Sequence, residues 1–135
     1  MIEERADHWL VQHSEVSQVK IDWAVTLLFL EGFEIRIAAP YVLTLPGREP
    51  LTIDPEDDPR LGVELLPLSR LVGAACTMFK SGELTIHFDN DIHLHVPLSH
   101  TPYEDWQLST REGRLFIAAP GGQLQIFGPN VGPGG

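Results

Sequence analysis

Polar and apolar residues alternate along much of this chain, most regularly in VTLLFLEGFEIRI (25–37) and ELTIHFDNDIHLHV (83–96). In each segment every second residue is apolar on both sides of a short break. The apolar positions are Val25, Leu27, Phe29, Phe33, Ile35 and Ile37 in the first segment and Leu84, Ile86, Phe88, Ile92, Leu94 and Val96 in the second. Alternation with a period of two is typical of antiparallel strands that bury one face, so each segment predicts a β-hairpin.

The register of these hairpins follows from keeping all six apolar residues on one face, because a slip of one residue would expose them. In the first hairpin Phe29 then lies opposite Phe33, and a three-residue loop ends in Gly32. Such loops need a left-handed residue at their third position, which suits glycine. In the second hairpin Asp91 takes this position, and aspartate tolerates the left-handed conformation better than most residues.

The two hairpins match each other without a gap at a shift of 59 positions, which takes Phe29 onto Phe88. A further strand-like segment precedes each hairpin, VSQVKID in the first case and GAACTMF in the second. We therefore predict an internally duplicated β-meander, with halves at about 14–43 and 73–100.

A main helix is predicted between the halves, at about 59–71. Asp58 is a suitable N-cap, and Pro59 suits the first helical position. Leucines recur at helical spacing over the same stretch, namely Leu61, Leu65 and Leu68. The N-terminal segment EERADHWLV predicts a second, short helix with Trp9 and Leu10 packed inward.

The last third of the chain predicts two more hairpins. One turns at Gly113, and the other turns at Pro120–Gly121 and places Ile117 opposite Leu124. With about nine short strands and one main helix, the chain is predicted to be mainly antiparallel β, or α+β in a loose sense. Residues 1–128 are expected to form one domain, and 129–135 a flexible tail.

The net charge of −10, from 19 acidic and 9 basic residues, argues against binding to nucleic acid, which requires a basic surface. It permits steering toward a basic protein partner. Cys76 is the single cysteine and lies in an apolar run, so we expect a buried, inert thiol and no disulfide. The acidic start of the chain lacks the apolar region of a signal peptide, and no apolar run would span a membrane, so a cytoplasmic protein is expected.

Three histidines form the first candidate for chemistry. The predicted register sets His87 directly opposite His93, with His95 one diagonal away on the same face. Imidazoles at this spacing could share a metal ion. The alternative is an outer sheet face that is rich in histidine without binding metal, and this is the interpretation adopted, with no cofactor predicted.

The second candidate is the segment Tyr103, Glu104 and Trp106. Tyrosine and tryptophan are enriched at interfaces, so these residues are candidates for a partner-binding patch. The structural alternative places Trp106 in the core beside Leu108.

Several motifs together give the chain a resemblance to a known family. They are V-x-x-V-x-I-D, T-L-L-F-x-x-G-F-E-I-R-I, G-E-L-T-I-H-F, P-Y-E-D-W and P-G-G. From about Trp9 to Phe127 the chain resembles a family of small actinobacterial domains of unknown function, whose members have a Tyr-Glu-x-Trp segment and a late Pro-Gly-Gly. Asp91 stands where that family usually has glycine. The resemblance implies the β-rich fold and carries over no activity or catalytic residue.

The chain lacks the motifs of common nucleophilic, metal-dependent and phosphate-binding enzymes. We therefore expect a non-enzymatic domain that acts through protein–protein contacts, of the immunity or adaptor type, with a partner that could be basic. Two alternatives stay open. One is a small metal-dependent β domain that uses the histidines, and the other is a structural homo-oligomer built through sheet edges.

Overall fold

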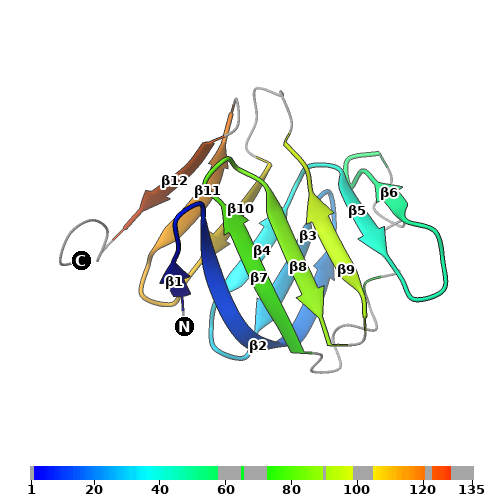
Figure 1. Cartoon of the computed structure of the whole chain (residues 1–135), viewed down its shortest axis with the longest axis horizontal. Helices are drawn as coiled ribbons and strands as arrows, with labels where there is room; N and C mark the ends of the chain where they lie inside the picture. Colours follow the sequence, from blue (N-terminus) through cyan, green and yellow to red (C-terminus); the bar gives the residue numbers. More distant parts are fainter. Residues whose placement is uncertain are drawn as a thin grey trace.

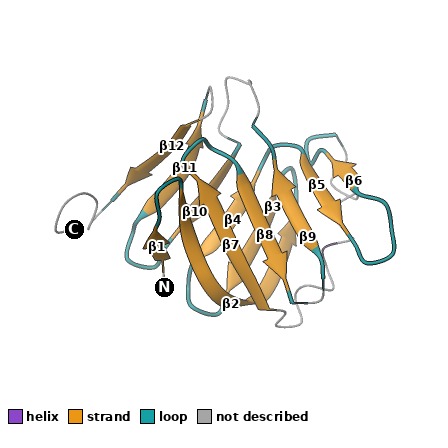
Figure 2. Ribbon diagram, viewed as in Figure 1, coloured by secondary structure: helices purple, strands orange, loops and turns teal. Residues whose placement is uncertain are grey.

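The computed structural model describes residues 2–57, 65, 73–89, 91–98, 105–120 and 123–128, and the regular elements in these residues are strands (Figures 1 and 2). The strands are β1 (Ile2–Glu4), β2 (His8–Ile21), β3 (Val25–Phe29), β4 (Glu34–Ile37), β5 (Tyr41–Thr44), β6 (Leu51–Ile53), β7 (Gly73–Phe79), β8 (Leu84–Phe88), β9 (His93–Val96), β10 (Trp106–Ser109), β11 (Leu115–Ala119) and β12 (Gln123–Phe127). Among these residues there is no helix with the length and apolar character needed to cross a membrane.

All strand pairs are antiparallel, in the order β12-β11-β10-β4-β3-β2-β7-β8-β9-β5-β6, with β1 beside β2. The path folds into two layers, with β7, β8 and β9 in one and β3, β4 and β10 in the other (Figure 1). β2 belongs to both layers, because its first part pairs with β7 and its second part with β3. Register shifts between Val11 and Ser14 and between Val16 and Gln18 mark irregularities that allow this long strand to bend.

The core lies between the layers and consists of the inward rows of the alternating strands. Its fully buried members include Leu27, Ile35, Ile86, Leu94, Leu108 and Phe116. Each fully buried side chain of this size contributes about 1.5–3 kcal/mol through removal of apolar surface from water. The alternation of apolar residues in the sequence therefore identifies the buried face of each strand.

The strands that follow the two meanders exchange places. β5 follows the first meander in the chain but pairs with β9 of the second, and β10 follows the second meander but pairs with β4 of the first. The registers agree as well: Val42 lies opposite His95, Gln107 lies opposite Arg36, and His95 is 59 positions after Arg36. The pairing thus has approximate two-fold symmetry, and each half completes the sheet of the other. A common origin of the halves stays a prediction.

The predicted hairpin registers are confirmed. In the first hairpin the Phe29 amide donates to the Phe33 carbonyl at 3.0 Å, and Gly32 has a φ of +93°. In the second hairpin the same bond joins the equivalent residues at 2.9 Å, and Asp91 has a φ of +63°. Asp91 is the only residue other than glycine with positive φ in the described part of the chain.

The prediction of a main helix between the halves is wrong, although the mainly antiparallel β class holds. Every regular element in the described residues is a strand. Of the predicted helix at 59–71 the structure describes only Leu65, which is fully buried in the core; the rest lies outside the described residues, as does the predicted tail. The physical reason lies in the prolines, because Pro67 cannot donate a helical hydrogen bond and limits any helix after Pro59 to two turns.

The N-terminal segment is also extended where a short helix was predicted, since His8–Ile21 forms one 14-residue strand. Trp9 packs against the core as expected. Leu10 lies on the opposite face, because successive residues of a strand point to opposite sides.

The two late hairpins have different outcomes. The turn at Gly113 is confirmed, with φ +96° and a bond from the Thr110 amide to the Arg114 carbonyl at 3.0 Å. The β11–β12 register is one residue from the prediction, with Ala118 opposite Leu124. The reason is that three residues separate these strands, as in the other hairpins, and the prediction assumed two.

Candidate functional site

The outer face of β8 and β9 holds two of the three candidate histidines in contact. His87 lies directly opposite His93, their Nδ1 atoms are 2.6 Å apart, and their rings are nearly perpendicular, at 82°. Two ring nitrogens at this distance need a hydrogen between them, so one imidazole donates and the other accepts. Burial, and then the nearby charge of His93, lowers the pKa of His87, which favours its neutral form.

His95 does not join this pair. Its Nδ1 lies 3.2 Å from the Thr85 hydroxyl, and its Nε2 lies 3.6 Å from the Glu83 carboxylate. Within the described residues, no group of three His, Cys, Asp or Glu side chains lies close enough together to hold a metal ion. The structure therefore groups His87 with His93 and leaves His95 with other partners.

The second candidate segment is divided by the structure. Tyr103 and Glu104 lie outside the described residues. Trp106 is only 1% exposed, and its indole Nε1 donates to the Gly82 carbonyl at 2.9 Å. It fills the core together with the fully buried Leu108, as the structural alternative proposed, and so joins β10 of one layer to the β7–β8 turn of the other.

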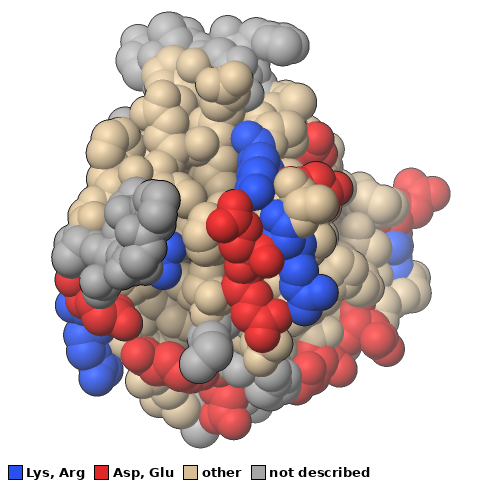
Figure 3. Space-filling model, turned by 60° about the vertical axis from the view of Figure 1, so that its left-hand side comes forward, with Lys and Arg blue, Asp and Glu red and all other residues tan. Residues whose placement is uncertain are grey.

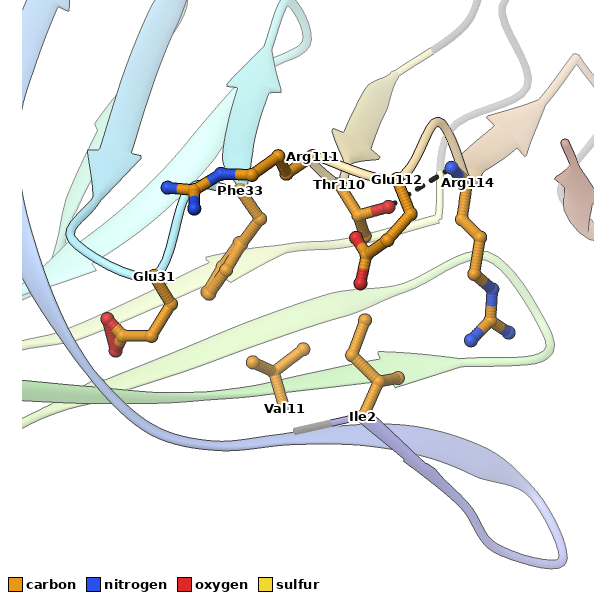
Figure 4. Close-up of a pocket in the computed structure, with 8 residues that line it drawn as sticks. All are labelled: Ile2, Val11, Glu31, Phe33, Thr110, Arg111, Glu112 and Arg114. Atoms are coloured by element: carbon orange, nitrogen blue, oxygen red, sulfur yellow. Dashed lines mark hydrogen bonds between the residues drawn. The ribbon is translucent and has the colours of Figure 1, made fainter. Parts of the chain in front are cut away.

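A cleft of about 310 Å³ lies where β1 and β2 face the β3–β4 and β10–β11 turns (Figure 4). Its floor is apolar and consists of Ile2 from β1, Val11 from β2 and Phe33 directly before β4. Val11 and Phe33 are buried core residues, so the strands hold this floor in place. The volume is at the lower end of the range typical of ligand pockets, which suits one side chain or a small molecule.

Four charged residues surround the floor, and the two arginines are engaged by the protein itself. The guanidinium of Arg111 lies against Gly32, where a Cβ atom would come within 2.5 Å of it. The guanidinium carbon of Arg114 lies 5.4 Å and 5.1 Å from the ring centres of Trp9 and Phe116, which is cation–π distance.

The acidic rim residues are Glu31 and Glu112. Figure 4 shows the Glu112 side chain pointing from the β10–β11 turn toward Ile2, whereas the Arg111 side chain extends toward the β3–β4 turn, beside Phe33. Hydrogen bonds with its own backbone and the Thr110 side chain, helped by the nearby arginines, lower the pKa of Glu112. Glu112 therefore carries a negative charge at neutral pH.

Figure 3 shows a face on which acidic and basic side chains alternate over a short distance, between broader areas of uncharged surface. Arginine and lysine side chains thus lie beside acidic ones on this face.

A family match covers most of the chain. The family of unknown function DUF6188 matches residues 7–128. The chain belongs to the DUF6188 family. No curated protein and no solved structure is similar enough to match it. The resemblance to a family of unknown function is confirmed, whereas the actinobacterial origin and the family motifs stay predictions. The match reaches from the residue before β2 to the residue after β12.

The cleft of this DUF6188 domain was missed in the sequence analysis. Its residues come from four separate segments, which only the folded sheets bring together. One local signal was available, since the turn STREGR places three charged residues on a tight turn after an apolar strand. The partner segment around Glu31 carries no comparable signal.

Proposed function

We propose that this DUF6188 domain is a non-enzymatic protein-binding module of the immunity or adaptor type. In this proposal the cleft between β1, β2 and the β10–β11 turn receives an apolar side chain from a partner of net positive charge. The single observation that carries the proposal is the apolar floor of Ile2, Val11 and Phe33 inside a charged rim. Protein interfaces concentrate binding energy in such apolar pockets, and the polar rim excludes water around them.

The chemistry of the titratable groups supports binding over catalysis. Burial raises the pKa of the Cys76 thiol to about 12, so it is not a thiolate nucleophile at neutral pH. The pKa of Glu112 is lowered, which makes this carboxylate a poor proton acceptor near neutrality. The cleft therefore offers shape and fixed charge, and its carboxylate is not tuned for proton transfer.

The charge of the whole chain supports a basic partner. A net charge of −10 attracts cationic proteins over long range and raises their association rate, in a way that salt screens. The rim of the cleft carries two acidic and two basic side chains, so in this proposal it would orient the bound partner at short range. We place this interaction in the cytoplasm as part of the proposal.

The test compares two variants with equal net charge. Glu112→Lys reverses a charge at the cleft, and Glu49→Lys reverses an exposed charge in the β5–β6 loop, which lies at the opposite side of the molecule (Figure 1). A partner captured from the cells of origin would be identified and purified, and its affinity for the three proteins measured at two salt concentrations.

We expect Glu112→Lys to weaken binding at least about tenfold and Glu49→Lys to have a much smaller effect. Higher salt should weaken binding to the wild-type protein. Equal losses of affinity in the two variants would show that the cleft is not the binding site. Binding that does not weaken at higher salt would contradict a basic partner.

A second candidate function, a structural homo-oligomer, is favoured by β12. This strand lies at one end of the sheet order, its sequence QLQIF carries no charge, and Phe127 is 49% exposed. Edge strands without charge are prone to pair with another chain. Mass measurement in solution tests this candidate: a dimer that dissociates on Gln125→Lys would support it, and a monomer at high concentration would exclude it.

A further inference from the structure

We propose that His87 and His93 together bind one divalent transition-metal ion, such as Zn²⁺, through their Nδ1 atoms. The site lies on the outer face of β8 and β9. It is independent of the cleft, and it requires no partner protein.

The contact between the two rings carries this inference. The Nδ1 atoms are 2.6 Å apart, so they already point at a common position between the strands. In the metal-free pair that position holds a hydrogen donated by one ring. A cation can take this position once the donor ring changes tautomer, so that its hydrogen moves from Nδ1 to Nε2. Both rings then carry their hydrogen on Nε2, and two Nδ1 lone pairs face the ion. With Zn–N bonds of about 2.0–2.1 Å and a tetrahedral angle, the nitrogens need to separate to roughly 3.3 Å.

The strands hold the pair in place and leave it accessible. Pairing sets Ala75 beside His87 on β7 and Thr44 beside His93 on β5, so small side chains flank the two imidazoles. Widening the contact by less than 1 Å requires only small side-chain rotations. Water would complete the coordination sphere, because two protein nitrogens fill only part of it.

His95 provides the matched control. It lies two residues from His93 on the same strand and the same face, and its two ring nitrogens face Thr85 and Glu83. A non-specific effect of histidine-rich surface would depend on His95 as much as on His93. Binding by the contact pair would not.

The experiment is calorimetric titration of the untagged full chain with ZnCl₂ at pH 7.5, for the wild type, His87→Ala, His93→Ala, His95→Ala and the double variant His87→Ala/His93→Ala. We expect one ion per chain in the wild type. Each single substitution in the pair should weaken binding at least about tenfold, because the second ligand acts at high effective concentration, and His95→Ala should bind as the wild type does.

Denaturant unfolding of each variant without metal establishes that the fold is retained. One ion per chain in the double variant would place the ion elsewhere and overturn the proposal. Equal losses in His95→Ala and His93→Ala, or no heat of binding in the wild type, would overturn it as well.

Discussion

Tyr41 and Trp106 begin the two strands that cross between the halves, and they occupy equivalent positions in the pairing. Trp106 lies opposite Ile37, and the register of β5 on β9 sets Tyr41 at the corresponding place. Both side chains are buried, at 0% and 1% exposure, but their polar atoms differ. The Trp106 indole donates to the Gly82 carbonyl, whereas the buried Tyr41 hydroxyl has no hydrogen-bond partner among the residues that the structure describes.

The halves also differ in the turn that corresponds to the one bonded by Trp106. Gly82 has a φ of +107° in the β7–β8 turn, which presents its carbonyl to the indole. Trp23 stands 59 positions earlier, in the β2–β3 turn, and is 63% exposed. A side chain at that position favours a different turn, in which the Asp22 amide bonds to the Ala24 carbonyl. The shared apolar rows thus keep the two halves alike in pairing, while turns and outer faces are free to differ.

Among the variants that test the difference between Trp106 and Tyr41, removal of Trp106 should have the largest effect on stability. Trp106→Ala creates a cavity in the core and breaks the bond between the layers, so we expect the free energy of unfolding to fall by about 3–5 kcal/mol. Denaturant unfolding measures this loss. Trp106→Phe keeps much of the side-chain volume but leaves the Gly82 carbonyl without its donor, so its loss in the free energy of unfolding should be smaller. An equal loss in the two variants would show that the hydrogen bond contributes more than the packing.

Exchanging the residues at the hairpin tips should have the next largest effect. Gly32→Asp places a side chain at φ +93° and against Arg111, and we expect a loss of about 1–2 kcal/mol in the free energy of unfolding. Asp91→Gly relieves the left-handed aspartate and should change stability by less than about 1 kcal/mol. The same unfolding assay measures both, and a loss of equal size in the two variants would contradict the assigned turn geometry.

Tyr41→Phe should have a smaller effect and the opposite sign. It removes a buried hydroxyl without a partner, so we expect a gain of up to about 1 kcal/mol. Burial raises the pKa of Tyr41 to about 12, so the wild type binds more protons when folded and loses stability as pH rises from 10 toward 12. Tyr41→Phe should lessen that alkaline loss. An unchanged alkaline slope would indicate that the hydroxyl reaches water.

His87→Leu should have the smallest effect, visible only in the pH dependence. Leu28 occupies the equivalent position in the first half, opposite Glu34. Because the folded pKa of His87 lies below its ordinary value of 6.5, the unfolded chain takes up more protons, and stability falls as pH drops through that value. The variant should lose less stability than the wild type between pH 7.5 and 5.5. A steeper loss would contradict the lowered pKa.

Local patterns predicted the hairpins well. A run with one dry face specifies its strands and its register, so the Phe29–Phe33 pairing, the left-handed Asp91 and the contact of His87 with His93 followed from the sequence. The prediction of a helix at 59–71 was wrong, because the helical spacing of the leucines does not offset the hydrogen bond that Pro67 removes. Strands β5 and β6 were not predicted, since they span only four and three residues, and β5 also depends on pairing with the distant β9.

By itself the sequence determined which residues lie opposite one another within the two repeated hairpins, because turn length and a single buried face fix a local register. Only the tertiary structure decided which strand crosses to which half, and so which residues meet in the cleft. Ile2, Glu31 and Arg111 are brought together by strand pairings between segments far apart in the chain. The alternation of apolar residues shows which face of a strand is buried, but not which other strand pairs with its edge.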